Sequence, residues 1–441
     1  MRNVGSSEME NRKSCKPGDI MSEKGMIMTI GVGGQNPDSL VSALQKSIEA
    51  ANPDFVYFVC SRTSQKTADT LESRLPERIQ RERFEISDEN NVDILFNDFM
   101  ELIGSLRRDR ECEPADLRMD YTSGTKAMSA AAILAAVSSG MNCIQYIAGQ
   151  RKDGVVQAGL EDIKTISPTR FMASVHLNQS IENLRALRYD AASAALAAVV
   201  VDALPPSDRD LPSALDALIK GYQAWDVFRQ DIAFELLKTT SRPHYKIQDL
   251  LFPKEKIGRF SQLKQTLFPE KMKNCDSSPK ALITEDVLAD LFNNAIRRMR
   301  EGKYDDACAR LYRLTEMCAQ FALQKHNIDT GHVREEQIPE ACRTKYCFEH
   351  EKKGQKEAKL GLHKNFELLR DLGNPVGDLL SPKTDFAATI STRNSSILAH
   401  GMMPVSRETC EKLRDHVFHL LQQIAPDMEA RCKALQFPWI K

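Results

Sequence analysis

The stretch LRMDYTSGTKAMSAAAILAAVSS, residues 117–139, joins a segment with strand character to an alanine-rich segment with helical character. We predict a strand over residues 117–121 and a helix over residues 126–139. Hydroxyl side chains and Gly124 lie between them. Glycine permits close backbone approach, hydroxyls donate hydrogen bonds, and the amino end of a helix favours anions. The stretch is therefore either an ordinary strand-to-helix turn or a loop that contacts an anionic ligand.

The same alternation of strand and helix extends from Met26 to Ala148. The predicted strands cover residues 26–32, 55–60, 83–86, 117–121 and 143–148, and helices at 39–50, up to about 75, at 92–106 and at 126–139 lie between them. Such alternation implies a mostly parallel sheet with helices on both faces. In these sheets ligands bind at the carboxyl ends of the strands.

Three strand ends carry residues suited to a ligand. They are the loops at residues 31–36, 61–66 and 120–126, which are rich in glycine, hydroxyl or amide side chains. Neither a dinucleotide fingerprint nor a Walker pattern is present. Each loop alone is compatible with a simple turn, but three of them on one sheet edge favour a nucleotide or another phosphate-rich ligand.

The remainder of the chain reads as helical from Ala173 onward. Helices are predicted at residues 180–203 and 214–237, and an antiparallel pair at 287–300 and 305–325 joined at Gly302. The stretches 185–198 and 298–311 resemble each other, because each carries a Tyr-Asp pair followed by alanine at helical spacing, as in the turn of a helical-hairpin repeat. Residues 1–25 are polar and aperiodic, so we expect a disordered tail.

Near the carboxyl end the sequence reads Arg393-Asn394-Ser395-Ser396-Ile397-Leu398-Ala399-His400. If the segment is helical from Thr384 or Asp385 to Gly401, seven residues correspond to about 700°, roughly 20° short of two turns, so Arg393 and His400 share one face. A fixed cation and an imidazole suit phosphodiester cleavage. The alternative is a surface arginine and a histidine that interacts favourably with the helix dipole.

These two motifs resemble those of the CRISPR-associated CARF–HEPN ribonucleases of type III systems, a Csm-six-like family. Arg393, Asn394 and His400 match the HEPN signature position by position. The resemblance implies an α/β Rossmann-like sensor (CARF) domain at residues 26–170, an all-α helical connector at 171–283 and an all-α HEPN nuclease domain at 284–441.

In CARF domains a cyclic oligoadenylate lies between two copies and contacts the loops after the first, second and fourth strands. Carried over to this sequence, the candidate ligand-binding residues are Gly33, Gly34, Gln35, Ser61, Thr63, Thr122, Ser123, Gly124, Thr125 and Lys126. The ligand would act as an allosteric activator, and the family resemblance implies no metal and no other cofactor.

The resemblance thus implies a homodimeric endoribonuclease that cuts single-stranded RNA when cyclic oligoadenylate binds. His400 would assist proton transfer as the RNA 2′-OH attacks the adjacent phosphate, Arg393 would stabilise the developing charge, and Asn394 would orient the phosphate or His400. The product would be a 2′,3′-cyclic phosphate. Two alternatives remain open: a catalytically silent sensor that binds RNA or regulates a partner protein, and a helical-repeat adaptor.

Composition limits the setting in which this chemistry takes place. The formal net charge of −1 excludes a global basic field, so any RNA contact must be local. The 11 cysteines show no disulfide-framework spacing, and no signal-peptide pattern is evident, so we expect a cytoplasmic protein. No apolar run is long enough to cross a bilayer, and we expect no membrane partner.

Overall fold

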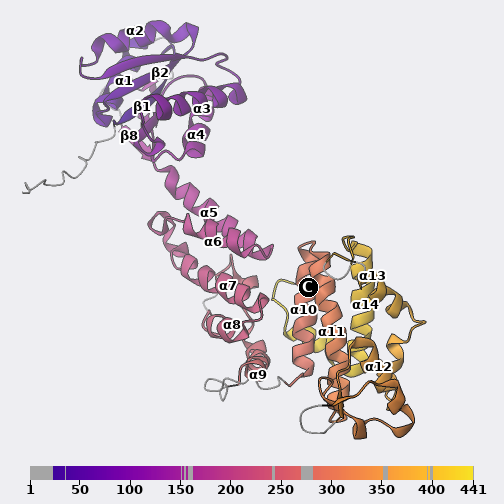
Figure 1. Ribbon diagram of the computed structural model, residues 1–441. Coiled ribbons are helices and arrows are strands. Elements are labelled where there is room, and N and C mark those ends of the chain that lie inside the picture. The colour runs from indigo at the N-terminus through magenta and orange to yellow at the C-terminus, as the bar shows by residue number, and fades with distance from the viewer. Residues whose placement is uncertain are drawn as a thin grey trace, which may run out of the picture. The chain divides into compact units, whose positions relative to one another are not determined.

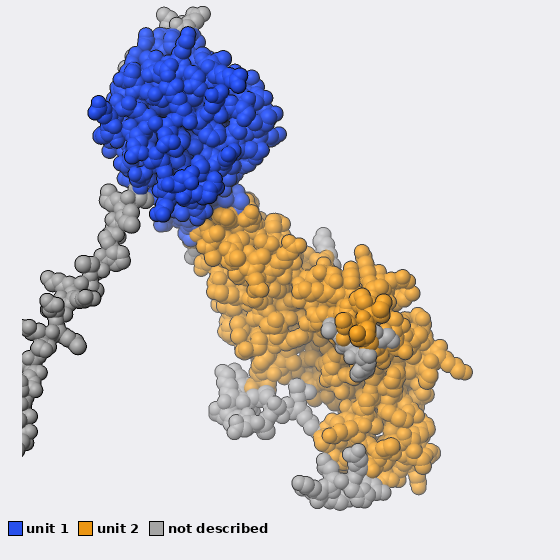
Figure 2. Space-filling model, turned by 45° about the horizontal axis from the view of Figure 1, so that its top comes forward, with its two compact units in different colours: residues 1–175, 200–204 blue, residues 176–199, 205–441 orange. Residues whose placement is uncertain are grey.

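The computed structural model describes residues 23–34, 36–149, 151–152, 155–156, 162–240, 244–269, 282–350, 356–394, 396–397 and 401–440. The chain divides into two compact units, which Figure 2 shows in blue and orange. The first comprises residues 1–175 and 200–204, and the second residues 176–199 and 205–441.

A six-stranded sheet with the order β3-β2-β1-β4-β5-β8 forms the centre of the first unit (Figure 1). Its strands are β1 (Gly25–Ile30), β2 (Phe55–Cys60), β3 (Gln80–Glu85), β4 (Leu117–Asp120), β5 (Cys143–Ala148) and β8 (Asp162–Ile166). The first five are parallel, and β8 pairs antiparallel with β5 at the edge. The strand order reverses between β1 and β4, which is where open α/β sheets bind ligands.

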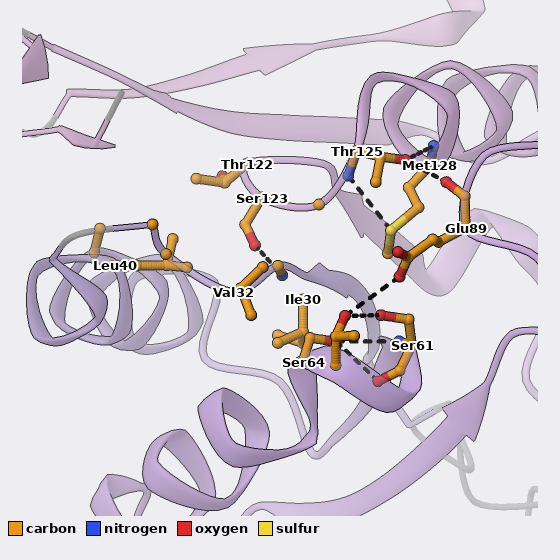
Figure 3. A pocket seen from close by; sticks show the side chains of 16 residues that line it. Ile30, Val32, Leu40, Ser61, Ser64, Glu89, Thr122, Ser123, Thr125 and Met128 are labelled. Carbon is orange, nitrogen blue, oxygen red and sulfur yellow. Dashed lines mark hydrogen bonds between the residues drawn. The ribbon is translucent and has the colours of Figure 1, made fainter. Parts of the chain in front are cut away.

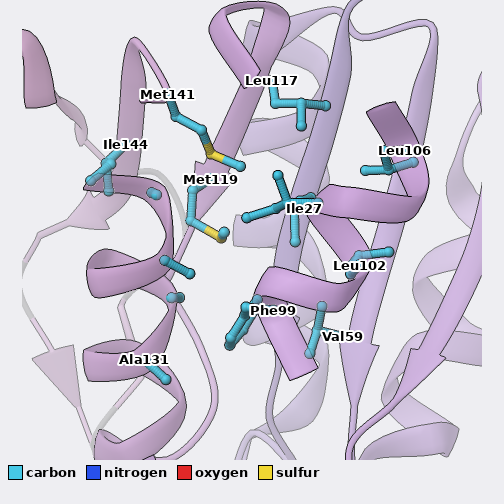
Figure 4. Packing of buried hydrophobic residues seen from close by; sticks show 14 of the residues in the cluster. Ile27, Val59, Phe99, Leu102, Leu106, Leu117, Met119, Ala131, Met141 and Ile144 are labelled. Atoms are coloured by element: carbon cyan, nitrogen blue, oxygen red, sulfur yellow. The ribbon is translucent and has the colours of Figure 1, made fainter. Parts of the chain in front are cut away.

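Helices cover both faces of this sheet because neighbouring residues of a strand point to opposite sides. The helices are α1 (Pro37–Ala51), α2 (Gln65–Arg74), α3 (Val92–Asp109) and α4 (Lys126–Ser139). Ile27 of β1 packs on one face with Phe99 of α3 and Ala131 of α4, as Figure 4 shows. Met28 packs on the other face with Leu44 of α1.

The α/β fold of the first unit and the helical remainder predicted from the sequence are confirmed. β2, α4 and β5 have the predicted bounds, and the other predicted strands and helices of the first unit are shifted at their ends by a few residues. Two features were not predicted: β8, and the short hairpin of β6 (Arg151–Lys152) and β7 (Val155–Val156).

The connector consists of helical hairpins, not of the two long helices that the sequence predicts. Its helices are α5 (Pro168–Arg185), which begins in the first unit, α6 (Tyr189–Ala197), α7 (Leu211–Asp226), α8 (Gln230–Leu237) and α9 (Ile257–Leu267). The predicted helices at 180–203 and 214–237 are wrong because Leu187 and Phe228, both with φ near 61°, turn the chain out of the helix. Neither position carries the glycine that commonly marks such a turn.

The carboxyl-terminal helices surround α11, which packs against α10, α12 and α14. They are α10 (Glu285–Arg300), α11 (Tyr304–Gln324), α12 (Leu362–Asp371), α13 (Asp385–Asn394), α14 (Arg407–Ile424) and α15 (Met428–Ala434). The predicted α10–α11 pair is confirmed, with Gly302 at φ 72° between the two helices. The region also contains a small sheet that was not predicted, formed by β9 (Val333–Arg334), β10 (Glu349–His350) and β11 (Lys356–Ala358).

A buried polar cluster fastens the connector to α10. Asp226, at the end of α7, accepts a hydrogen bond from Arg297 Nε at 2.6 Å and also pairs with Arg298. Arg297 is fully buried, and burial lowers the pKa of its guanidinium. Removing one partner of a buried pair costs about 3–5 kcal/mol because the other charge is left without compensation. The connector and the carboxyl-terminal helices are therefore one compact unit.

Within the part of the chain that the structure describes, no helix combines the length and apolarity needed to span a membrane.

Candidate functional site

A cavity of about 410 Å³ opens at the carboxyl end of the sheet, where the strand order reverses (Figure 3). The loops after β1, β2 and β4 line it, together with Glu89 from the segment after β3. The lining residues are Ile30, Gly31, Val32, Gly33, Gly34, Leu40, Ala43, Ser61, Thr63, Ser64, Glu89, Thr122, Ser123, Gly124, Thr125 and Met128. The cavity belongs entirely to the first unit.

Most of the residues proposed from the sequence as ligand contacts line this one cavity. Those brought together are Gly33, Gly34, Ser61, Thr63, Thr122, Ser123, Gly124 and Thr125. Gln35 lies outside the described residues. Lys126 is the exposed first residue of α4 and is not part of the lining.

The floor of the cavity requires a close approach between the loops after β1 and β4. The Gly31 N–H donates a hydrogen bond to Ser123 Oγ at 2.5 Å, and Thr29 Oγ1 donates to the Ser123 carbonyl. A Cβ at position 31 would lie 2.6 Å from the backbone nitrogen of Gly124. Gly124 itself has a φ of 98°, which strongly favours glycine.

A buried carboxyl group holds the loop after β4 in place. Asp120 is fully buried, accepts a hydrogen bond from the Thr122 N–H at 2.8 Å, and contacts Ser47 of α1 and Gln145 of β5. Burial raises the pKa of Asp120, and these hydrogen bonds oppose the rise. The Thr122 side chain accepts from the Ile147 N–H at 3.0 Å, so the loop is anchored to β5.

Thr125 connects the amino end of α4 to the cavity. Its hydroxyl accepts from the Met128 N–H at 3.1 Å, which caps the helix, and donates to the Glu89 carbonyl. The helix amino end next to this cap carries partial positive charge and favours an anionic group.

The opposite wall has a different chemistry. Ser61 Oγ and Thr63 Oγ1 lie 2.9 Å apart, and Thr63 Oγ1 donates to Glu89 Oε2 at 3.4 Å. A carboxylate repels phosphate but accepts hydrogen bonds from hydroxyl and amino groups. One wall thus suits phosphate and the other suits a sugar or base. Glu89 was missed from the sequence because the segment after the third strand lacks the glycine-rich pattern of the other loops.

The segment with the Arg393 motif is only partly helical. Thr384 caps α13 by accepting from the Ala387 N–H at 3.2 Å, and Asp385 and Phe386 contact His416 of α14. The helix ends at Asn394, and beyond it Ser396 pairs with Met403. Figure 1 places α13 beside α14.

The prediction of a helix continuing to Gly401 is therefore wrong. The Ile397 N–H donates to the Met403 carbonyl and the Gly401 N–H donates to the Ser396 carbonyl, both at 3.0 Å, so turn bonds replace helical ones. Asn and Ser favour such local alternatives to helix. Asn394 is partly buried, whereas the Arg393 side chain and all of His400 lie outside the described residues. Their pairing stays a prediction.

No group of three or more His, Cys, Asp or Glu side chains suited to a metal ion occurs among the described residues.

The two units thus define a class of protein: an α/β domain with a cavity at the carboxyl end of its sheet, joined to a helical domain. Residues 280–424 match the family model of the Csm6 HEPN domain, so this part of the chain is similar to that family. The resemblance to CARF–HEPN ribonucleases inferred from the two motifs is confirmed.

The fold of the whole chain is also found in a solved structure. Enterococcus italicus Csm6 bound to cyclic hexa-2′-fluoro-hexa-dAMP matches with a TM-score of 0.54 and 15% identity, over 95% of this chain and 99% of that chain. Can2 from Sulfobacillus thermosulfidooxidans in complex with cyclic tetra-adenylate matches with 11% identity over 59% of this chain and 75% of that chain. Its TM-score of 0.22 is too low to carry an argument. No curated protein matches the sequence.

Proposed function

We propose that this chain is a cytoplasmic, cyclic-oligoadenylate-activated endoribonuclease that cleaves single-stranded RNA in type III CRISPR antiviral defence. The observation that carries the proposal is the cavity at the switch point of an α/β domain in a chain that also contains a Csm6-type HEPN domain. The paired chemistry of the cavity, phosphate-binding on one wall and hydrogen-bond accepting on the other, fits an oligonucleotide.

The activator is best accommodated by two copies of the chain. A cyclic oligoadenylate repeats one nucleotide around a ring, and a cavity of about 410 Å³ suits a part of such a ring. α4 supports dimerisation because it is apolar around its circumference: Ala131 and Ala135 are buried, and Leu134 is half exposed on another side. A helix that is apolar all round needs a covering partner, and a second copy would supply it.

Cleavage is assigned to the segment at the end of α13. Arg393 stabilises the developing charge on phosphate, His400 moves a proton, and Asn394 orients the phosphate or His400. The 2′-OH attacks its own phosphate, so the products carry a 2′,3′-cyclic phosphate and a 5′-OH, and no metal is required. Ligand binding shifts a two-state dimer toward the arrangement in which two such segments act together.

The product ends and a single variant test this chemistry. The wild-type protein is incubated with a 5′-labelled single-stranded RNA and EDTA, in the presence of cyclic tetra-adenylate or cyclic hexa-adenylate, and the fragments are analysed by mass spectrometry. We expect 2′,3′-cyclic phosphate ends from the wild type and a loss of about 10²–10⁴-fold in rate for His400→Ala. Products with 3′-OH ends, or a fully active His400→Ala protein, would contradict the assignment.

A second candidate function is favoured by the end of α13 at Asn394. Ser396 and Ile397 are not helical, so the helix that carries Arg393 does not continue through these two residues. A chain with the motif in this arrangement fits a catalytically silent, dimeric sensor that binds RNA or regulates a partner protein. Ligand-dependent RNA binding without cleavage would establish this alternative.

A further inference from the structure

Two cavities of the second unit lie outside the site described above and share one residue, Arg300. The first, of about 530 Å³, is lined by Arg185, Ala186, Leu187, Arg188, Arg300, Glu301 and Lys303. The second, of about 370 Å³, is lined by Ile296, Met299, Arg300, Tyr304, Arg407, Glu411 and Arg414. Because Arg300 borders both, the two cavities adjoin.

The lining of these cavities is strongly basic although the chain as a whole is not. Six cationic and two anionic side chains line them, a formal charge of +4, whereas the chain carries −1. The two carboxylates pair with cations of the same lining, Glu301 with Lys303 and Glu411 with Arg407, each at 2.8 Å. Arg185 and Arg414 pair with carboxylates beside the lining, Asp249 and Asp415. A hollow with this local charge attracts a polyanion.

The second cavity adds surfaces that suit a nucleobase. Tyr304 is partly buried and presents an aromatic ring, and Met299 and Ile296 supply apolar contact. Proteins that bind single-stranded nucleic acid combine a basic groove for the backbone with aromatic side chains on which bases stack. An acidic protein segment would use the cations but would leave Tyr304 without a role.

Two cations of the first cavity, Arg188 and Lys303, follow the same kind of turn. Leu187 and Gly302 occupy the left-handed region, with φ of 61° and 72°. The next residue, Arg188 or Lys303, caps the following helix, and its N–H donates to the carbonyl five residues earlier at 2.9 Å in both cases. The sequence similarity between residues 185–198 and 298–311 is therefore a structural one, and it brings two matching basic turns to one cavity.

The second cavity lies close along the chain to the segment with the Arg393 motif. The Val405 N–H donates to both carboxylate oxygens of Asp305, the neighbour of Tyr304, at 3.2 Å each. Arg407, in the cavity lining, follows Met403 by four residues, and Met403 pairs with Ser396. Four residues span at most about 14 Å, so Arg407 lies within that distance of Met403, the bridge partner of Ser396 in the candidate nuclease segment.

We propose that the two cavities form one track that binds the backbone and a base of single-stranded RNA beyond the scissile phosphate. This proposal rests on the proposed function, because it assigns the track to the RNA that the HEPN segment cleaves. It makes the affinity for RNA depend on length: a long RNA occupies the track and a very short one does not.

The test compares the track variant Arg188→Ala/Lys303→Ala with the control Lys220→Ala/Lys238→Ala, which removes two exposed cations outside the cavities. Both are made in full-length His400→Ala protein, and binding of fluorescein-labelled 30-nucleotide and 6-nucleotide polyuridine is followed by anisotropy across salt concentrations, with cyclic hexa-adenylate or cyclic tetra-adenylate present. Losing two phosphate contacts lowers the salt slope by about 1.4 and the affinity at 0.1 M salt by about 25-fold. We expect these losses for the 30-mer in the track variant only.

Unchanged 30-mer affinity and salt slope in the track variant would overturn the proposal, and so would equal losses for the 6-mer. If the alanine variant fails to fold, the variant Arg188→Gln/Lys303→Gln replaces it in the same binding test. The same track variant with His400 intact separates the two proposals. If the track binds RNA as expected but no ligand elicits cleavage, the nuclease function fails and the track stands. If ligand elicits cleavage but the track variant loses affinity equally for the 30-mer and the 6-mer, the track proposal fails and the nuclease function stands.

Discussion

Replacing Gly31 by alanine tests whether the cavity depends on contact between the loops after β1 and β4. The added Cβ would lie 2.6 Å from the backbone nitrogen of Gly124 and 3.2 Å from Ser123 Oγ. Backbone cannot rotate away as a side-chain end can, so the loop after β4 must move. The move breaks the hydrogen bond from the Gly31 N–H to Ser123 Oγ.

The expected size of the effect follows from two contributions. The lost hydrogen bond costs about 1 kcal/mol, and forcing an extra methyl into a packed site costs about 1–3 kcal/mol. The free energy of unfolding of the first unit should therefore fall by about 2–4 kcal/mol. At about 2–4 °C per kcal/mol for a unit of this size, its Tm should fall by roughly 4–16 °C.

Differential scanning calorimetry of the full chain measures this change, and isothermal titration with cyclic tetra-adenylate and cyclic hexa-adenylate measures ligand affinity. Gly104→Ala is the matched control, since Gly104 lies within α3 and a Cβ there would meet only the flexible end of Arg108 at 3.3 Å. Alanine in a helix interior should stabilise by about 0.5–1 kcal/mol. If Gly31→Ala melts and binds ligand like Gly104→Ala, the cavity does not depend on this contact between the two loops.

Three further predictions concern single interactions. Thr125→Val should lower the stability of the first unit by about 1 kcal/mol and weaken ligand binding, because the cap of α4 is lost; Thr125→Ser, which keeps the hydroxyl, should restore both in thermal melts and titrations. Asp226→Ala should lower the free energy of unfolding of the second unit by about 3–5 kcal/mol in urea, because Arg297 is left buried without its partner, whereas Asp216→Ala at an exposed pair should cost at most about 0.5 kcal/mol. Burial raises the pKa of Asp120. Just above the ordinary pKa of about 3.9, the unfolded chain has released the proton that the folded unit still holds. The wild type should therefore lose stability relative to Asp120→Asn as the pH rises above that value. If urea titrations between pH 4 and 7 show a constant difference in the free energy of unfolding between these two proteins, this last prediction is contradicted.

Local patterns account for how much of the first unit could be predicted. β2 and β5 are apolar runs flanked by turns, and the TSGTK segment before α4 combines a cap, a glycine and small helix-forming residues, so neighbours in sequence determine the structure. β8 escaped prediction because its residues are mostly exposed or half-buried and its pairing with β5 is an edge contact. That pairing depends on tertiary structure.

The turns of the connector show a second reason why prediction fails. A left-handed residue ends α5 at Leu187 and α7 at Phe228, and such a conformation is expected of glycine. The buried side chain of Leu187 compensates for it by packing, whereas the exposed side chain of Phe228 does not. Gly302, which does carry the usual signal, was correctly placed between two helices.

Only part of the candidate site could likewise be predicted from the sequence. The glycines and hydroxyls after β1, β2 and β4 could be assigned to one cavity because parallel strands end at one edge. Glu89 could not, since a lone glutamate between strand and helix carries no pattern. The end of α13 at Asn394 depends on the pairing of Ser396 with Met403, a contact that the spacing of Arg393 and His400 does not reveal.

The most direct test of the central claim is the rate at which the purified wild-type protein cleaves a fluorogenic single-stranded RNA in EDTA, with and without cyclic oligoadenylate. We expect either cyclic tetra-adenylate or cyclic hexa-adenylate to raise the rate at least tenfold, and Gly31→Ala to need a higher ligand concentration for the same rise. A rate independent of both ligands, or no cleavage despite tight ligand binding, would show that the chain is not a ligand-activated ribonuclease.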